Sequence, residues 1–126
     1  MARLRFASRA PVCATVVLPV EDFSANGQQC LNRLCQPRGQ AHREPKCLYY
    51  GFSFNGNEVH CREGYEGAEA ALSHLANVGS LLEGALKISE LSRLEVHGME
   101  EELAKLRGPL ADFHPTYFTL EYGIRR

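Results

Sequence analysis

The sequence contains no tryptophan, no Cys-x-x-Cys pair and no apolar run of membrane-spanning length. A membrane-spanning helix needs about 18 or more predominantly apolar residues. The longest such run, residues 12–20, is interrupted by Thr15 and Pro19 and is rich in β-branched residues. It therefore predicts a strand, and no membrane span is expected.

The cysteines are odd in number and are not spaced as zinc ligands. They are Cys13, Cys30, Cys35, Cys47 and Cys61. Neither a disulfide framework nor a metal site is expected from such a pattern. We interpret them as reduced thiols, which favours a cytoplasmic location.

Charge and length give further limits. The net charge is -1 and the basic residues alternate with acidic ones, so no nucleic-acid partner is expected. A chain of 126 residues is enough for one domain. We interpret residues 1–11 as a disordered or extended leader and 12–126 as the domain. Three arginines and no acid in residues 1–10 are also typical of a transit peptide, which leaves an organellar location as the alternative.

Hydrophobic periodicity predicts the elements in order. Strands are expected at 12–20, 47–55, 58–65, 91–97 and 115–122, and helices at about 25–36, at 67–88 and from 98 to about 107. Asn55-Gly56 predicts a hairpin turn, and Pro37 predicts a kink or loop after the first helix. The order β-α-β-β-α-β, followed by a short helix and a last strand, predicts an α+β, ferredoxin-like fold. One sheet face would lack a helical cover, so we expect a homodimer that pairs these faces.

The segments CLYYGFSFNG, CREGYEGAEAALSHLANVGSLLEGALKI, LEVHG and PTYFTLEYG resemble the antibiotic biosynthesis monooxygenase (ABM) family of dimeric α/β barrels. The motif positions are Glu63, Tyr65 and the run 71–75. The resemblance implies a monooxygenase that uses no cofactor. In such an enzyme a phenol or quinol is deprotonated in an apolar pocket between sheet and helices, and its anion reacts with dioxygen.

The candidate catalytic residues are His74, Tyr65 and Glu63. His74 lies at the border of the apolar stripe of its helix and titrates near neutral pH, although such a histidine can also face water. Tyr65 and Glu63 share one face of their strand. Tyr65 could equally be ordinary core, and Glu63 could simply pair with Arg93. Asn77 is expected to face solvent on the opposite side of the helix.

The candidate ligand-binding residues are Tyr50, Phe52, Leu75 and Arg93. Arg93 belongs to a predicted polar band with His60, Arg62, Glu95 and His97, which would form either an ion-paired dimer interface or a clamp for a ligand carboxylate. Two other functions remain open. One is a non-catalytic, homodimeric ligand-binding or scaffold protein. The other is haem degradation, for which the usual second histidine of the helix is missing.

Overall fold

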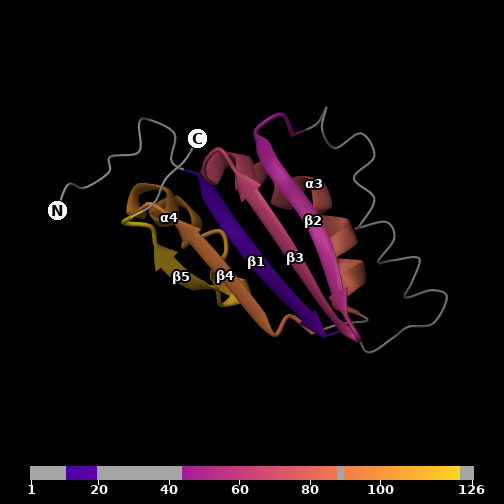
Figure 1. The fold of residues 1–126 in the computed structure, drawn as a ribbon. Helices are drawn as coiled ribbons and strands as arrows, with labels where there is room; N and C mark the ends of the chain where they lie inside the picture. Colours follow the sequence, from indigo (N-terminus) through magenta and orange to yellow (C-terminus); the bar gives the residue numbers. More distant parts are fainter. Residues whose placement is uncertain (1–10, 20–43, 88–89, 123–126) are drawn as a thin grey trace.

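The structure, a computed structural model, describes residues 11–19, 44–87 and 90–122 (Figure 1). The helix predicted at 25–36 and the kink at Pro37 lie outside these ranges, as does the predicted leader except for its last residue.

The described elements follow the predicted order. They are β1 (Val12–Pro19), β2 (Cys47–Asn55), β3 (Glu58–Tyr65), α3 (Ala68–Leu86), β4 (Arg93–Gly98), α4 (Glu100–Leu106), η1 (Ala111–Phe113) and β5 (Thr116–Thr119). The hairpin of β2 and β3 has the predicted limits, and Gly56 in its turn has a φ of 58°, a value that glycine adopts without strain. The 3-10 turn η1 stands where only a loop was expected.

The sheet has the strand order β2-β3-β1-β4-β5. β1 is antiparallel to both of its neighbours, and β5 adds to the edge parallel to β4. The order of the first four strands is that of a ferredoxin-like fold, which confirms the predicted class. β1 separates β3 from β4, so His60 and Arg62 are not direct neighbours of Arg93 within the sheet. The predicted polar band would need these strands, or those of a second copy, to be adjacent.

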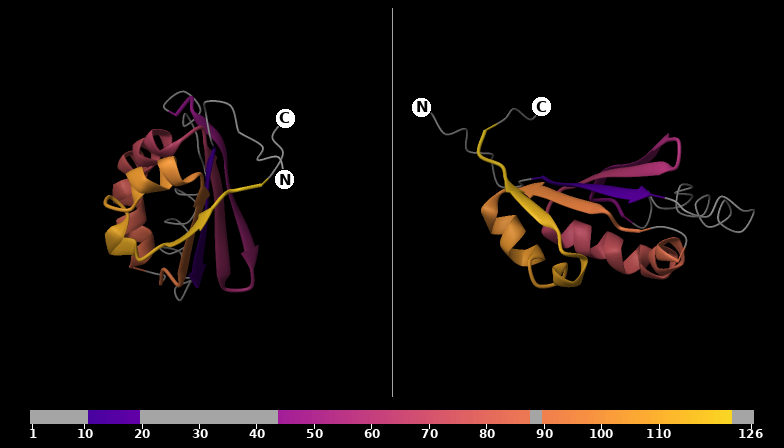
Figure 2. Two further views of the ribbon diagram at one scale, coloured as in Figure 1. Left: turned by 90° about the vertical axis from the view of Figure 1, so that its left-hand side faces the viewer. Right: turned by 90° about the horizontal axis from the view of Figure 1, so that it is seen from below.

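The described helices lie on one side of the sheet (Figure 2). α3 runs behind β2 and β3, and α4 lies beside β4 and β5. None of the helices in the described ranges is long and apolar enough to cross a membrane. The sheet and the described helices therefore form two layers with a single interior between them.

The core between the layers is formed by Val12, Ala68, Val96, Leu103 and Leu106, each at most 1% exposed. Burial of a large aliphatic side chain stabilises a fold by about 1.5–3 kcal/mol. This cluster therefore fixes α4 and the start of α3 against β1 and β4.

The first turn of α3 is held by a side chain from α4. Glu102 accepts a hydrogen bond of 3.0 Å from the backbone N–H of Ala68, and its side chain is 20% exposed. A carboxylate at a helix N-terminus satisfies a free N–H group and complements the positive end of the helix dipole. Glu102 thus couples the two described helices that pack on the sheet.

We expect Glu102→Ala to lower the free energy of unfolding by about 1 kcal/mol, because the variant loses this acceptor and its charge. Urea denaturation measures the effect. Glu102→Gln, which retains an acceptor oxygen, should lose less, and replacement of exposed Glu101 by Ala serves as the control. Equal stability of Glu102→Ala and Glu101→Ala would show that the cap contributes nothing.

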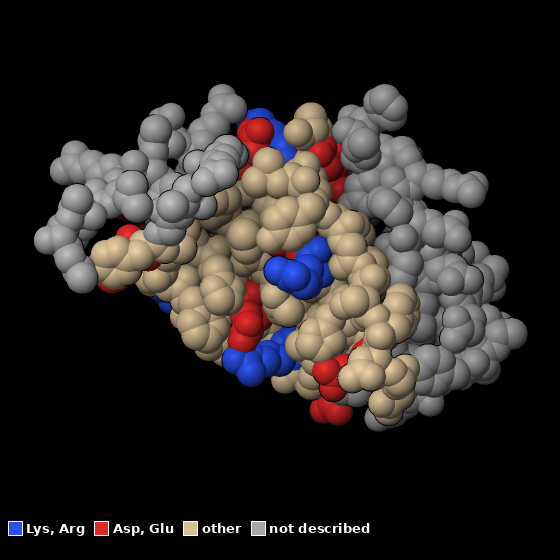
Figure 3. All heavy atoms as spheres, in the orientation of Figure 1, with Lys and Arg blue, Asp and Glu red and all other residues tan. Residues whose placement is uncertain are grey.

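The sheet face opposite the described helices carries both charged and uncharged groups (Figure 3). Because Glu63, Ala14 and Val96 face the helices, period-two alternation directs Arg62, Thr15 and the Arg93–Glu95 ion pair to the open side. In Figure 3, basic and acidic groups lie amid the uncharged atoms of this face. Arg62, Arg93 and Glu95 of the predicted polar band therefore lie on this one face.

Candidate functional site

An apolar cavity of about 120 Å³ lies between the sheet and its helical cover. The sheet contributes its floor, α3 its roof, and the α4–η1 region one side. Representative lining residues are Phe52, Val16, Leu94, Leu75, Val78 and Phe113. Because an apolar cavity of about 150 Å³ can bind benzene, the space here suits roughly one six-membered ring.

His74 lies at the wall of this cavity between two carboxylates. Its Nδ1–H donates to both oxygens of Glu44, at 2.9 and 3.0 Å, and its Nε2 lies 3.4 Å from Oε2 of Glu63. All three side chains are largely buried, with exposures of 6% for His74, 3% for Glu44 and 14% for Glu63. A carboxylate on Nδ1 fixes the orientation of an imidazole and directs its other nitrogen towards a partner. The arrangement is suited to proton transfer at Nε2.

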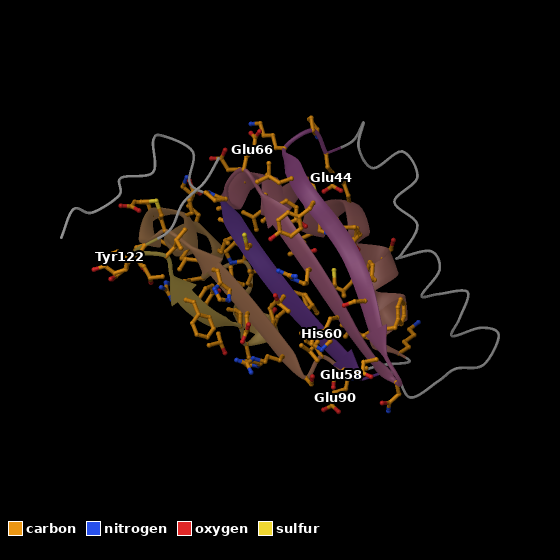
Figure 4. The ribbon with its side chains drawn as sticks, viewed as in Figure 1. Glu44, Glu58, His60, Glu66, Glu90 and Tyr122 are labelled. Atoms are coloured by element: carbon orange, nitrogen blue, oxygen red, sulfur yellow. The ribbon has the colours of Figure 1, made fainter. Side chains whose placement is uncertain are left out.

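Three local features bring these groups together. His74 is in the second turn of α3, and Glu63 is two residues from the end of β3. Glu44 precedes β2, at the end of the sheet where β3 leads into α3; Figure 4 shows it near Glu66, far from His60 and Glu58. The hydrogen bond between Glu44 and His74 joins positions 30 residues apart.

Aromatic rings and a thiol complete the polar part of the wall. The centroid of the His74 ring lies 4.7 Å from that of Tyr50 and 5.4 Å from that of Tyr65. Sγ of Cys61 donates to Oε2 of Glu63 over 3.7 Å. The Tyr65 hydroxyl is buried and interacts with the carboxyl group of Glu63.

Burial controls the protonation of two of these groups. It raises the pKa of Glu63 above its ordinary value, against the opposing attraction of His74. Burial, reinforced by the negative charge of Glu63, also raises the pKa of Tyr65. Tyr65 therefore keeps its proton at neutral pH, and Glu63 holds a proton more readily than an exposed glutamate. A buried carboxyl with a raised pKa can act as an acid.

We expect the free energy of unfolding of Glu63→Gln, relative to that of the wild type, to increase as the pH rises. The unfolded chain loses the Glu63 proton near the ordinary value of 4.5, whereas the folded protein keeps it to higher pH. The unfolded state then binds fewer protons, so this group makes the wild type less stable as the pH rises through that window. Glutamine does not titrate, so the variant lacks this loss of stability.

Urea denaturation at several values between about pH 4 and pH 7 measures this trend as the stability of the variant minus that of the wild type. Glu101→Gln, at an exposed position, is the matched control. A difference that shrinks with rising pH would contradict the assignment of a raised pKa to Glu63.

The predicted site residues divide into two groups. His74, Tyr65, Glu63, Tyr50, Phe52 and Leu75 all line the one cavity. Arg93 does not, because its side chain is 58% exposed on the opposite face and pairs with Glu95. The predicted Glu63–Arg93 pair is therefore wrong. Asn77 is exposed, as expected.

The sequence analysis missed Glu44 and gave Cys61 no role. Glu44 lies outside any periodic element, and no residue pattern indicated its contact with His74. Cys61 shares the parity of Glu63 on β3, so its position on the cavity wall could have been read from that alternation. Within the described ranges, no group of three or more His, Cys, Asp or Glu side chains is placed to hold a metal ion.

A protein of known structure resembles this chain over nearly its whole length. The chain is 39% identical to MupZ from Pseudomonas fluorescens, over 92% of this chain and 94% of MupZ, with a TM-score of 0.78. No family model matches the chain, and no curated protein matches it in sequence.

More distant solved structures share the fold. A "putative antibiotic biosynthesis monooxygenase" from Caulobacter crescentus is 13% identical, with a TM-score of 0.57 over 73% of this chain and 90% of its own. A protein of the same description from Chloroflexus aurantiacus is 12% identical, with a TM-score of 0.52 over 68% of this chain and 89% of its own. These likenesses concern the fold. The chain therefore belongs to the same family as MupZ, and it shares the ferredoxin-like fold with the two more distant proteins.

Proposed function

We propose that this protein is a monooxygenase that uses no cofactor and acts on a small aromatic or quinol ligand in the cavity beside His74. The observation that carries the proposal is the buried His74, held by Glu44 and facing Glu63 at the wall of an apolar cavity. The likeness of the fold to proteins described as antibiotic biosynthesis monooxygenases supports the reaction class.

In the proposed first step, a phenol hydroxyl gives its proton to His74 Nε2. Glu44, hydrogen-bonded to Nδ1, stabilises the resulting imidazolium. General-base catalysis of this kind contributes about 10²–10⁴-fold. The phenolate left in the apolar cavity is electron-rich and poorly solvated, which favours its reaction with dioxygen.

In the proposed second step, dioxygen forms a bond to an unsubstituted ring carbon ortho or para to the phenolate oxygen. The ring carbon then loses its hydrogen as a proton, and the O–O bond breaks. One oxygen atom remains as a ring carbonyl and the other leaves as water. Glu63, whose pKa is raised by burial, is placed to carry this proton from the ring carbon to the leaving oxygen, and the imidazolium of His74 returns the phenol proton to complete the water.

Oxygen uptake tests this function. The protein should consume dioxygen with at least one member of a panel of phenols, naphthols and hydroquinones, and should place one ¹⁸O atom from ¹⁸O₂ in the product. Heat-denatured protein controls for autoxidation. Absence of uptake above that control with every panel member would argue against the oxygenase.

A second candidate function is acid–base catalysis that needs no dioxygen. Glu44, His74 and Glu63 form a continuous chain of groups that could move a proton across a bound molecule. An isomerisation, elimination or addition would need only this chain. Turnover of a ligand under strictly anaerobic conditions would favour it, whereas binding without turnover would favour the non-catalytic ligand-binding protein.

We also propose that the protein is a homodimer joined through the open sheet faces. Tyr49 and Phe118 are 46% and 40% exposed on this side. Thr15 lies between Arg62 on β3 and Glu95 on β4, so opposite charges flank the middle of the face. In a two-fold interface, such charges can pair with their counterparts on the other copy.

Analytical ultracentrifugation tests the dimer. Arg62→Glu should raise the dissociation constant at least tenfold, because like charges then oppose each other, and the double variant Arg62→Glu/Glu95→Arg should recover part of the loss. A wild type that sediments as a monomer at high concentration would exclude this interface. The odd number and the spacing of the cysteines support the cytoplasmic location that we propose.

A further inference from the structure

The floor of the cavity is divided into two halves by the register of the sheet. In one row across the strands, Glu63 on β3 lies opposite Tyr50 on β2 and opposite Ala14 on β1. Beyond Ala14 the same row continues to Val96 on β4. The floor therefore changes from polar to aliphatic between β3 and β1.

The neighbouring rows repeat the division. Cys61 on β3 is followed by Val16 on β1 and Leu94 on β4, and Tyr65 is followed by Val12. The side chains with polar atoms thus lie over β2 and β3, whereas β1 and β4 present only aliphatic groups to the cavity.

The roof shows the same division. His74 stands over the polar half, 3.4 Å from Glu63 and in ring contact with Tyr50. Leu106 and Leu110 pack with Val96 over the aliphatic half. The floor and the roof of the cavity are therefore polar on the same side, and a bound ligand should have its polar end there.

The cavity wall supplies no permanently positive charge in the described part of the chain. None of the described residues that line it is Lys or Arg. Transfer of an anion into such a place costs free energy, because no cation replaces its hydration.

From this division we infer that the ligand is an uncharged phenol with its single hydroxyl in the polar half and an alkyl substituent on the opposite edge of the ring. The inference names the ligand class of the proposed function, and it rests on that function in taking the cavity as the ligand site and the ligand as a phenol. A hydroxyl at both ends, as in hydroquinone, would leave one of them buried against aliphatic groups without a partner. A carboxylate in place of the hydroxyl would meet Glu63.

Four molecules of similar shape test the inference by calorimetric or NMR titration without dioxygen: 4-methylphenol, hydroquinone, p-xylene and 4-methylbenzoate. We expect 4-methylphenol to bind at least tenfold more tightly than hydroquinone, because an unpaired buried hydroxyl is costly. It should also bind at least tenfold more tightly than 4-methylbenzoate. Hydroquinone or the benzoate binding as tightly as 4-methylphenol would overturn the inference.

Two variants test the orientation of the ligand. Glu63→Leu should lower the ratio of the 4-methylphenol affinity to the p-xylene affinity at least fivefold, because the hydroxyl then has His74 alone as a partner. Leu94→Ala, in the aliphatic half, should leave that ratio unchanged and should allow longer 4-alkyl groups, with about a fourfold gain per added methylene. A ratio that Glu63→Leu leaves unchanged and Leu94→Ala lowers would place the hydroxyl in the aliphatic half and contradict the inference.

The binding and oxygen experiments can fail separately. If 4-methylphenol binds as expected but no ligand supports oxygen uptake, the oxygenase proposal fails and the ligand class stands. If oxygen is consumed with hydroquinone, which also binds as tightly as 4-methylphenol, the function stands and the ligand class is wrong. Circular dichroism of each variant confirms that it is folded before its binding is compared.

Discussion

We expect His74→Gln to lower kcat of the proposed reaction by about 10²–10⁴-fold, the usual contribution of a general base. Gln retains an N–H donor for Glu44 and approximates the shape of the ring, so the loss is chemical rather than structural. His74→Ala would instead leave Glu44 and Glu63 buried beside an empty space. Steady-state oxygen consumption measures the effect.

The matched control for this prediction is Asn77→Ala, on the exposed side of the same helix. It should retain the activity of the wild type. Glu44→Gln should show an intermediate loss, because the amide still contacts the ring but cannot stabilise an imidazolium. A His74→Gln protein as active as the wild type would remove His74 from the mechanism.

The second large effect is on stability. Leu103 and Leu106 are 0% and 1% exposed in the same core cluster, so each change to Ala should lower the free energy of unfolding by about 2–5 kcal/mol. The loss combines the burial of the removed methyl groups with the space left behind. Urea denaturation measures both variants under identical conditions.

The two leucines differ in one respect, which makes them controls for each other. Leu106 lines the cavity and Leu103 does not. Leu106→Ala should therefore also admit a longer alkyl group on a bound phenol, whereas Leu103→Ala should leave the preferred ligand length unchanged. Identical ligand preferences in the two variants would contradict the assigned wall of the cavity.

Much of the fold could be predicted because its elements have strong local signals. Asn55-Gly56 marks the hairpin, and the apolar stripe of the segment around His74 marks α3. These patterns depend on neighbouring residues alone. The 3-10 turn η1 has no such period, and it was missed.

The candidate site could be predicted only where it follows from periodicity. Alternation along β3 placed Glu63 and Tyr65 on one face, and the helical stripe placed His74 near the sheet. Glu44 could not be found in this way, because its contact with His74 depends on how the chain enters β2. Arg93 was misplaced because its parity directs it to the open side of β4, a fact that becomes clear only once Leu94 and Val96 are known to face the helices.

The central claim is that the cavity beside His74, rather than the open sheet face, is where this protein binds its ligand. A crystal structure of the protein soaked with 4-methylphenol tests it most directly. We expect the ring between α3 and the sheet, with its hydroxyl within hydrogen-bond distance of Glu63 or His74. A ligand found only on the open face near Tyr49 and Arg62, with the cavity closed by its own side chains, would contradict the account.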